Sequence, residues 1–226
     1  MKTSVFFTIL IGFTTFFTAP IFLSENIAVA ETTQYEPPDV GKPTRRTGAG
    51  TRGKGHTIRL DVLAPTHTGH TSQSQPTLYW FVSETEEVRV LIQNMQPQSI
   101  DDANLTLDKT LTAKASGTQV LSLAEHDFSL KPGSIYEWSV SLAKSPKTIA
   151  SGTIRWVQPN DVLAKGIDTA EGKVKYDLFA EHGYWYDTIH GVLEMISQDA
   201  SNEDYKADRT ALLKQVKLPQ LATVIK

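Results

Sequence analysis

The sequence predicts a mainly β protein with helices: a fibronectin- or immunoglobulin-like β-sandwich followed by a small C-terminal helical region packed on it. Between residues 57 and 158, short runs of β-forming residues are separated by polar turns. After Pro159, apolar residues recur at intervals of three and four, as in amphipathic helices. We therefore expect a leader (1–30), an extended basic, glycine-rich lead-in (31–56), the sandwich (57–158) and the helical region (159–226). The polar first part of the lead-in, Glu31–Lys42 with Pro37-Pro38, is expected to be mobile.

The first thirty residues have the pattern of a signal peptide. Lys2 precedes an apolar run from Val5 to Leu23, and Ala28-Val29-Ala30 gives the small-x-small pattern that signal peptidase cleaves. The alternative reading of so long a run is an uncleaved membrane anchor. Past the leader no apolar run reaches membrane-spanning length. The sequence thus predicts export to the periplasm, or alternatively to the medium, with no membrane span after cleavage.

Composition excludes several functional classes. The net charge of the whole chain is −3, so no global basic surface points to a nucleic-acid partner. The chain has no cysteine, which removes disulfides, lipoprotein anchoring, thiolate zinc sites and cysteine nucleophiles. An exported protein without disulfides has to be stabilised by its hydrophobic core, which is therefore expected to be sizeable.

Seven strands are predicted from period-two alternation and β-propensity. They are Ile58–Val62, Thr77–Val82, Val88–Ile92, Leu105–Leu111, Val120–Leu123, Ile135–Leu142 and Thr153–Val157. The segment Thr66–Pro76 is polar and is predicted to be a loop with nothing to bury. Residues 130–140 resemble a turn and strand of fibronectin type III-like domains, in which the hydroxyl of a tyrosine, here Tyr136, bonds back to the preceding corner.

Three helices are predicted after the strands. Asn160 caps a short helical turn, and Thr169 or Asp168 caps a helix over 170–182 that stops at Gly183. An amphipathic helix follows over 184–198. Asn202 caps the last helix, which runs to about residue 216 and is ended by Leu218-Pro219.

The stretch from Lys42 to Gly55 combines cations with glycines and precedes the first strand. Its spacing matches parts of two phosphate-loop patterns, but no apolar strand leads into it and no helix leaves it, so nucleotide binding is not expected. Arg45, Arg46 and Arg52 are candidates for contact with an anion or a partner. The reading that we favour is internal pairing of these arginines with acids such as Asp39, Asp61 or Asp187.

Three separated motifs place the chain beside a known family. They are Gly41 to Gly53 in the basic stretch, Pro76 to Phe81, and Gly183-Tyr184-Trp185-Tyr186-Asp187. In this order they resemble the bacterial family called domain of unknown function 928. The resemblance implies an exported protein of bacteria with two membranes and no established activity. The sequence departs from the family pattern at Ala49, where a glycine is expected, and at Arg209, where a tryptophan is expected.

Other side chains are candidates for chemistry. Asp187, His190 and Glu194 are spaced to share one helix face, with His182 nearby, as an acid–base or metal group or as plain surface pairs. His67 and His70 lack an adjacent carboxylate, so no metal site is predicted. The aromatic residues fit either a carbohydrate-binding face or, as we favour, core and domain seam. They are Trp80, Trp138, Trp156, Tyr184, Trp185 and Tyr186.

The sequence favours a non-enzymatic exported module that binds an envelope or surface protein or a glycan, with no cofactor. Its expected contact residues are Arg45, Arg46, Arg52, Trp185, Tyr186 and Asp187. The alternative is a periplasmic enzyme acting on glycan or peptide through carboxylates and His190. A cleft with convergent acids or histidines and aromatic walls would favour the enzyme, and a flat surface with paired arginines would favour binding.

Overall fold

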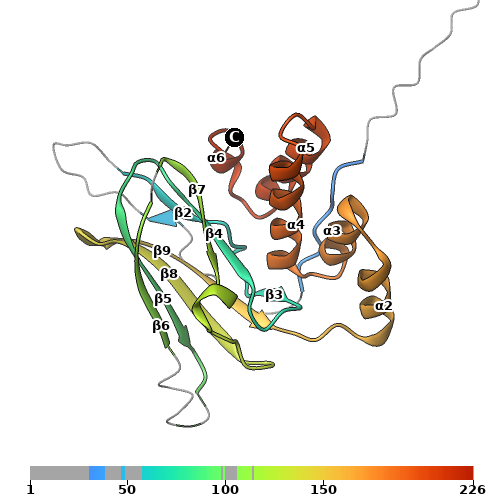
Figure 1. The fold of residues 1–226 in the computed structure, drawn as a ribbon, viewed down its shortest axis with the longest axis horizontal. Helices are drawn as coiled ribbons and strands as arrows, with labels where there is room; N and C mark the ends of the chain where they lie inside the picture. The colour runs from blue at the N-terminus through green and yellow to red at the C-terminus, as the bar shows by residue number, and fades with distance from the viewer. Residues whose placement is uncertain are drawn as a thin grey trace, which may run out of the picture. The chain divides into compact units, whose positions relative to one another are not determined.

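The computed structural model describes residues 31–38, 47–48, 58–97, 99, 106–113 and 115–225. The leader, Asp39 and the candidate arginines Arg45, Arg46 and Arg52 lie outside the described residues. Residues 31–226 form one compact unit. In it two β-sheets are followed by a C-terminal helical region, so the fold is mixed α/β (Figure 1). No helix in the described ranges has the length and apolar character needed to cross a membrane.

The strands of the described residues form two sheets. The first has the order β1-β2-β4-β7 and is antiparallel throughout; it consists of β1 (Thr47–Gly48), β2 (Leu60–Val62), β4 (Thr77–Val82) and β7 (Gly117–Ser122). The second has the order β3-β9-β8-β5-β6; it consists of β3 (Gly69–Thr71), β9 (Ser145–Trp156), β8 (Ile135–Leu142), β5 (Glu87–Asn94) and β6 (Thr106–Thr112). Within this second sheet, β3 and β9 are parallel and the other pairs are antiparallel.

All seven predicted strands are present, and β4 and β8 occupy the predicted residues. The prediction for Thr66–Pro76 is wrong in part, because Gly69–Thr71 forms β3 at the edge of the second sheet. Thr68 and Thr71 are also buried there, so this polar segment does bury side chains. Their burial comes from β9, which lies far away in sequence, and polar threonines give no apolar signal from which to predict it.

Strand β8 has the alternation that its sequence predicts. Tyr136, Trp138, Val140 and Leu142 are buried, and the residues between them are partly exposed. The hydroxyl of Tyr136 accepts a hydrogen bond from the backbone N–H of Lys131, 3.1 Å away. The predicted bond from this tyrosine back to its preceding corner is therefore confirmed.

Five helices follow the strands, and η1 (Ala124–His126) is a short 3₁₀ turn between β7 and β8. The helices are α2 (Asp161–Thr169), α3 (Gly172–Glu181), α4 (Trp185–Gln198), α5 (Glu203–Gln215) and α6 (Pro219–Ala222). The predicted caps Asn160 and Asn202 are confirmed, since each side chain accepts backbone N–H bonds from the first turn. The predicted cap at Thr169 or Asp168 is wrong, because α2 continues through both residues and α3 begins at Gly172.

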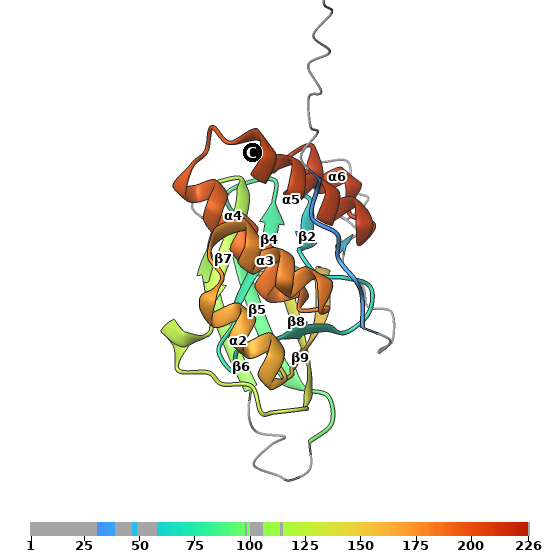
Figure 2. The ribbon, with the colours of Figure 1, turned by 90° about the vertical axis from the view of Figure 1, so that its right-hand side faces the viewer.

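The helical region packs on the sheets and shares their core. Figure 2 shows α2, α3 and α4 in front of the strands. Buried side chains of both sheets and of α3, α4 and α5 form one continuous hydrophobic cluster. At its centre, Trp185 of α4 donates from Nε1 to the backbone oxygen of Leu63, 2.9 Å away. Trp138 of β8 donates in the same way to the hydroxyl of Tyr186, at 2.8 Å.

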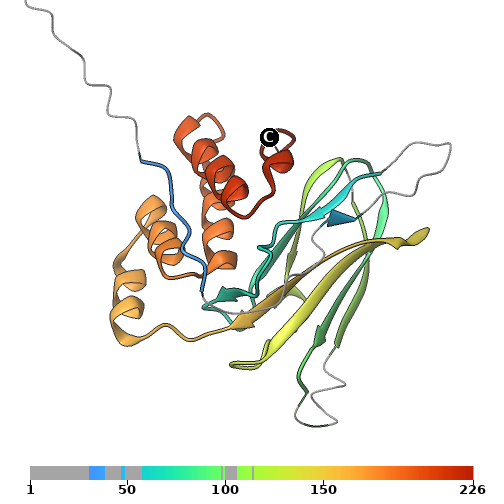
Figure 3. The same cartoon turned by 180° about the vertical axis from the view of Figure 1, so that it is seen from behind.

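The lead-in is extended at residues 31–38, as predicted, but this part of it is not mobile. Thr33 and Tyr35 are 3% and 8% exposed, whereas the residues that alternate with them face solvent more. Figure 3 shows the segment, in blue, running beside the helices. The prediction of a mobile lead-in fails here because polar groups of α3 and α5 fix the segment, and those groups lie more than 140 residues away in sequence.

Gly152 of β9 lies where a side chain would collide with the core. A Cβ there would lie 2.6 Å from the Cβ of Ala64 and 3.0 Å from Nε1 of Trp138. Gly152→Ala is therefore expected to lower the free energy of unfolding by about 1–3 kcal/mol, measured by urea denaturation. The control is Gly166→Ala in α2, where the nearest atom is Leu178 Cδ1 at 3.6 Å. This control is expected to stabilise the protein by about 0.5–1 kcal/mol, because alanine favours helix. Equal stabilities of the two variants would contradict the packing at Gly152.

Candidate functional site

One face of α4 and one face of α3 enclose a pocket of about 300 Å³ beside the β3–β4 connection. Asp187, His190 and Glu194 of α4 all line it, so the predicted shared helix face is confirmed. The other lining residues come from the β3–β4 connection and from α2, α3 and α4: Ser72, Gln73, Ile167, Gly172, Lys175, Tyr176, Phe179, Gly191 and Met195. His182 is not among them; it is exposed, with Nδ1 2.9 Å from the backbone oxygen of Leu178.

Asp187 is the most deeply buried acid of the pocket, with 4% of its surface exposed. Its Oδ2 accepts the backbone N–H of Ser72 at 3.0 Å, and its Oδ1 accepts the Ser72 hydroxyl at 2.7 Å. The amide Nε2 of Gln73 lies 3.4 Å from Oδ1. Burial raises the pKa of the Asp187 carboxyl, and the bonds from Ser72 act in the opposite direction. Asp187 therefore fixes the β3–β4 connection to α4 and forms a wall of the pocket.

His190 is held between two other polar groups. The hydroxyl of Tyr79 in β4 lies 2.7 Å from Nδ1 of His190. Burial raises the pKa of Tyr79 to about 12, so this hydroxyl stays protonated at neutral pH. Which of the two groups donates depends on the tautomer of the imidazole. In the tautomer that accepts from Tyr79 at Nδ1, the imidazole carries its own proton on Nε2. That nitrogen is 3.9 Å from Oε2 of Glu194, so the pocket presents an N–H donor beside a carboxylate acceptor.

Two of the predicted contact residues, Trp185 and Tyr186, are buried in the core. Their exposed fractions are 0% and 1%. Tyr186 donates its hydroxyl to the backbone oxygen of Thr153, 3.0 Å away, and accepts from Trp138. In this conformation neither side chain offers surface to a partner, and both hold α4 on the sheets. Trp80, Trp138 and Tyr184 are buried too, so the core reading of the aromatic residues holds for them, and Trp156 is half-buried.

Two of the acids proposed as partners for the basic stretch, Asp61 and Asp187, have other partners among the described residues. Asp187 is held by Ser72 and Gln73, as above. Asp61, fully buried in β2, is paired with Nε of Arg59. The described part of the basic stretch is strand β1, which pairs with β2 so that Thr47 lies opposite Asp61. The basic stretch therefore reaches the free edge of the first sheet.

His67 of the β2–β3 connection and His70 of β3 take separate aromatic partners. The ring of His67 stacks on Tyr35, and its Nε2 lies 2.8 Å from the Tyr35 hydroxyl. His70 is edge-on to Tyr184. Burial, together with Arg155 and His67, lowers the pKa of His70 to about 4, so its ring is neutral at pH 7. Within the described ranges, no group of three or more acidic or histidine side chains is arranged to hold a metal ion.

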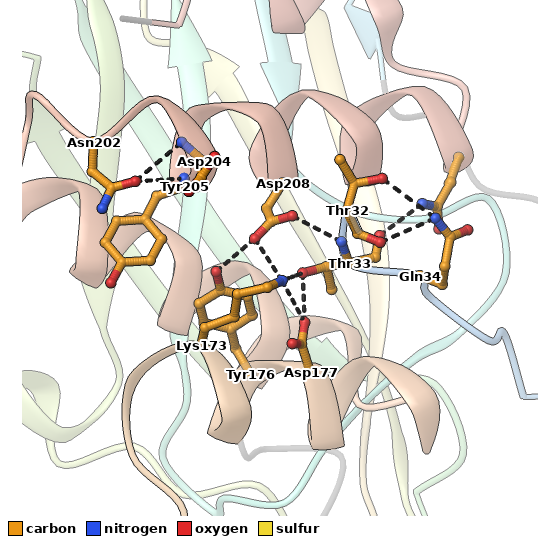
Figure 4. A network of polar contacts seen from close by, with 11 residues as sticks. Thr32, Thr33, Gln34, Lys173, Tyr176, Asp177, Asn202, Asp204, Tyr205 and Asp208 are labelled. Carbon is orange, nitrogen blue, oxygen red and sulfur yellow. Dashed lines mark hydrogen bonds and ion pairs between the residues drawn. The ribbon is translucent and has the colours of Figure 1, made fainter. Parts of the chain in front are cut away.

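A second polar cluster, which sequence reasoning missed, fixes segment 31–38 to the helices (Figure 4). Its centre is Asp208 of α5, which is 2% exposed. The Asp208 carboxylate accepts the backbone N–H of Thr33 at 2.8 Å, Nζ of Lys173 at 2.9 Å and the hydroxyl of Tyr176 at 2.7 Å. Asp208 thus joins the lead-in, α3 and α5. No sequence pattern indicates it, because an acid in a polar helix is normally exposed.

Arg209, where the family resemblance leads us to expect tryptophan, is 5% exposed in α5. Burial lowers the pKa of its guanidinium. Its Nε and Nη1 have no hydrogen-bond partner within the part of the chain that the structure describes. This departure therefore puts a buried charge on the helix that carries Asp208.

Comparison with known proteins gives a family and little more. The model of the family described as Domain of Unknown Function (DUF928) matches residues 47–225. No curated protein matches the sequence. Among solved structures, a multi-domain immunophilin from Arabidopsis thaliana aligns with 83% of this chain and 96% of its own, at 10% identity and a TM-score of 0.19. At that score the likeness carries no inference about fold or function.

Proposed function

Because the chain belongs to the family described as Domain of Unknown Function (DUF928), whose description carries no activity, we propose a function from the pocket itself. The proposal is an exported, non-enzymatic module that binds a glycan in the pocket between α3 and α4. Asp187, His190 and Glu194 converge on one cavity with aromatic walls, the feature expected of an enzyme. The observation that carries binding instead is that Asp187 and His190 are already engaged, by Ser72 and Tyr79.

The lining fits the mixed chemistry of a sugar. Glu194 supplies acceptor oxygens, and Lys175 and the Nε2 of His190 supply donors. Gln73 adds an amide that can both donate and accept. Sugar hydroxyls need donors and acceptors close together, and their C–H faces need apolar cover. Phe179, Ile167 and Met195 provide that cover in this pocket.

The hydrogen bonds of the pocket favour binding over catalysis. A serine nucleophile has to donate its proton to a base such as histidine. Ser72 instead donates to Asp187, and Nδ1 of His190 is bonded to Tyr79. Asp187 itself accepts bonds from Ser72 and Gln73, which leaves it little capacity to act on a substrate.

The proposal also includes the cellular compartment, which is the envelope, and the type of β fold, which is an immunoglobulin-like sandwich. The leader-like residues 1–30 support export to the envelope. An immunoglobulin-like sandwich is supported by the strand order, with β2-β4-β7 in one sheet and β9-β8-β5-β6 in the other. This is the A-B-E and G-F-C-C′ arrangement of that fold, and the Lys131–Tyr136 bond adds to it.

The proposal is tested by titrating the cleaved protein with maltotriose, cellotriose and triacetylchitotriose and following backbone amide NMR shifts. Saturable shifts at Gly172, Gly191 and Gln73 with one of these sugars are expected. Glu194→Gln is expected to weaken that binding at least about 5-fold, because it removes a charged acceptor. Glu181→Gln, an exposed change at the end of α3 outside the pocket, is the control. Absence of shifts with all three sugars, or shifts confined to another surface, would contradict the proposal.

One observation favours a glycan-cleaving enzyme as a second candidate. Tyr79, His190 and Glu194 form a chain of polar groups at the pocket, with distances of 2.7 and 3.9 Å. Such a chain can hold and release a proton at Nε2 of His190. Cleavage of the same sugars, lost in His190→Gln while binding persists, would favour the enzyme over the binding module.

A further inference from the structure

We propose that segment 31–38, here called the N-terminal strap, regulates the pocket: the seated strap holds α3 in place as a pocket wall, and its release loosens that wall and weakens ligand binding. The inference rests on the proposed function of the pocket and adds a control element to it. The strap contacts one side of α3 while the pocket lies against another side of the same helix.

The backbone of the strap is held from both sides. On the α5 side, Gln215 donates from Nε2 to the backbone oxygen of Thr33 at 3.0 Å and accepts the N–H of Tyr35 at 2.7 Å. On the α3 side, the N–H of Glu36 donates to the backbone oxygen of Ala180 at 3.0 Å. An extended segment bound by its backbone between two helices keeps one fixed register along them.

Thr33 links α3 to α5, because its backbone N–H bonds to Asp208 of α5 and its hydroxyl bonds to residues of α3. We call this set of contacts the bridge between the two helices. The hydroxyl of Thr33 donates to Oδ1 of Asp177 at 2.6 Å and accepts from Nζ of Lys173 at 3.0 Å. Nζ of Lys173 also reaches Asp177 and Asp208 (Figure 4). Burial acts to lower the pKa of Lys173, but its hydrogen bonds to Asp208 and Asp177 outweigh burial and raise that pKa. The ammonium group therefore stays charged at the centre of this bridge.

Tyr176 connects the strap cluster to the pocket. Its side chain lines the pocket, and its hydroxyl donates to Oδ2 of Asp208. The same carboxylate accepts the backbone N–H of Thr33 through Oδ1. The pocket wall and the strap are thus bonded to opposite oxygens of one buried acid. Loss of the strap removes one of the groups that fix this carboxylate, and with it a constraint on Tyr176.

Helix α3 depends on such contacts for its position. It has ten residues, and its N-cap, Glu171, makes no side-chain capping bond. A helix of this length is marginal without tertiary contacts. One support is α4, where a Cβ on Gly191 would lie 2.8 Å from the Cβ of Tyr176, so the two helices pack closely. The strap is another support, on a different side of α3.

The C-terminal half of the strap, from Tyr35 to Pro38, packs against the turn between α3 and α4. The hydroxyl of Tyr35 lies 3.5 Å from the backbone oxygen of Gly183, and its ring is edge-on to Trp185. Gly183 adopts a positive φ of 78°, and a Cβ there would lie 3.0 Å from Cδ of Pro38 and 3.1 Å from the oxygen of Glu36. The strap therefore passes directly over the turn that sets the angle between the two pocket helices.

The test uses Gln215→Ala in the cleaved protein, with Gln198→Ala, an exposed glutamine at the end of α4, as the matched control. Gln215→Ala removes two hydrogen bonds to the strap and alters no side chain of the pocket. Hydrogen exchange of residues 33–36 and of α3 is expected to become about 10–30-fold faster. Affinity for the sugar that the wild-type protein binds is expected to fall at least about 5-fold. Thr33→Val, which removes the hydroxyl bonds but keeps those of Gln215, is expected to act in the same direction.

The outcomes separate the inference from the proposed function. Two outcomes contradict the inference and leave the binding function standing. In the first, the backbone amides of the strap exchange faster but those of α3 do not. In the second, the amides of α3 exchange faster but the affinity for the sugar is unchanged. If the wild-type protein binds none of the sugars, the proposed function is contradicted, and exchange of α3 decides the inference alone. Faster exchange in Gln215→Ala and not in Gln198→Ala would then support control of the α3 wall by the strap.

Discussion

Trp185→Ala is expected to lower the free energy of unfolding by about 3–5 kcal/mol. The side chain is fully buried where α4 meets both sheets, and its removal leaves a cavity that the surrounding elements cannot fill. The backbone oxygen of Leu63 also loses its donor, Nε1 of Trp185, and the edge-on contact with Tyr35 disappears. Urea denaturation followed by circular dichroism gives the change directly.

Two further variants make this result specific. Trp185→Phe keeps an aromatic ring but loses the donor to Leu63, so an intermediate loss of about 1–3 kcal/mol is expected. Val162→Ala removes a side chain that is 83% exposed in α2 and is expected to change stability by less than about 0.5 kcal/mol. A loss below about 1 kcal/mol in Trp185→Ala would contradict its place in the shared core.

Asp208→Ala is expected to cost about 3–5 kcal/mol of unfolding free energy, comparable to the loss of one partner of a buried ion pair. Three donors lose their acceptor together: the N–H of Thr33, Nζ of Lys173 and the hydroxyl of Tyr176. Burial, the largest cause of the raised pKa of Tyr176, does not depend on Asp208, so the hydroxyl stays protonated and lacks its acceptor in the variant. The same denaturation experiment measures the effect, and proteolysis within residues 31–38 reports release of the strap.

The loss of acceptors can be separated from the loss of volume. Asp208→Asn keeps the shape and one acceptor oxygen but turns an amide group toward surrounding donors, so most of the destabilisation is expected to remain. Asp204→Asn, an exposed acid one turn earlier on α5, is the control and is expected to cost at most about 0.5 kcal/mol. A similar, small effect of both asparagine variants would show that Asp208 is not the centre of the cluster.

The strands and helices were predictable where a periodic pattern and local burial agree. Strand β8 alternates buried and exposed residues along its whole length, and its bounds follow from that alternation. Strand β3 has three residues, one of them glycine, and is a strand because β9 pairs with it. The beginning of α3 was mispredicted because Thr169 has the chemistry of a cap, while its hydroxyl bonds back to Lys165 inside α2.

The sequence predicts the part of the candidate site that lies on a single helix, but it does not predict which residues of other elements meet that helix. The spacing of Asp187, His190 and Glu194 places them on one face of α4, and the pocket lies there. Ser72 and Gln73 meet that face from more than a hundred residues away, and spacing along the chain contains no information about such a contact. The burial of Trp185 and Tyr186 agrees with the favoured core reading of the aromatic residues, whereas the contacts of α4 that bury them lie far away in sequence.

The bonds of Thr33 have a consequence for the order in which the chain folds. Thr33 is among the first residues to be synthesised after the leader-like segment, and its partner Asp208 follows 175 residues later. Gln215, which bonds to the backbone of Tyr35, lies 180 residues further along the chain and is synthesised later still. The beginning of the domain can therefore reach its final position only when almost the entire polypeptide has been made. The chain would then complete its structure by bringing residues 33–35 onto α5 as one of its last folding steps.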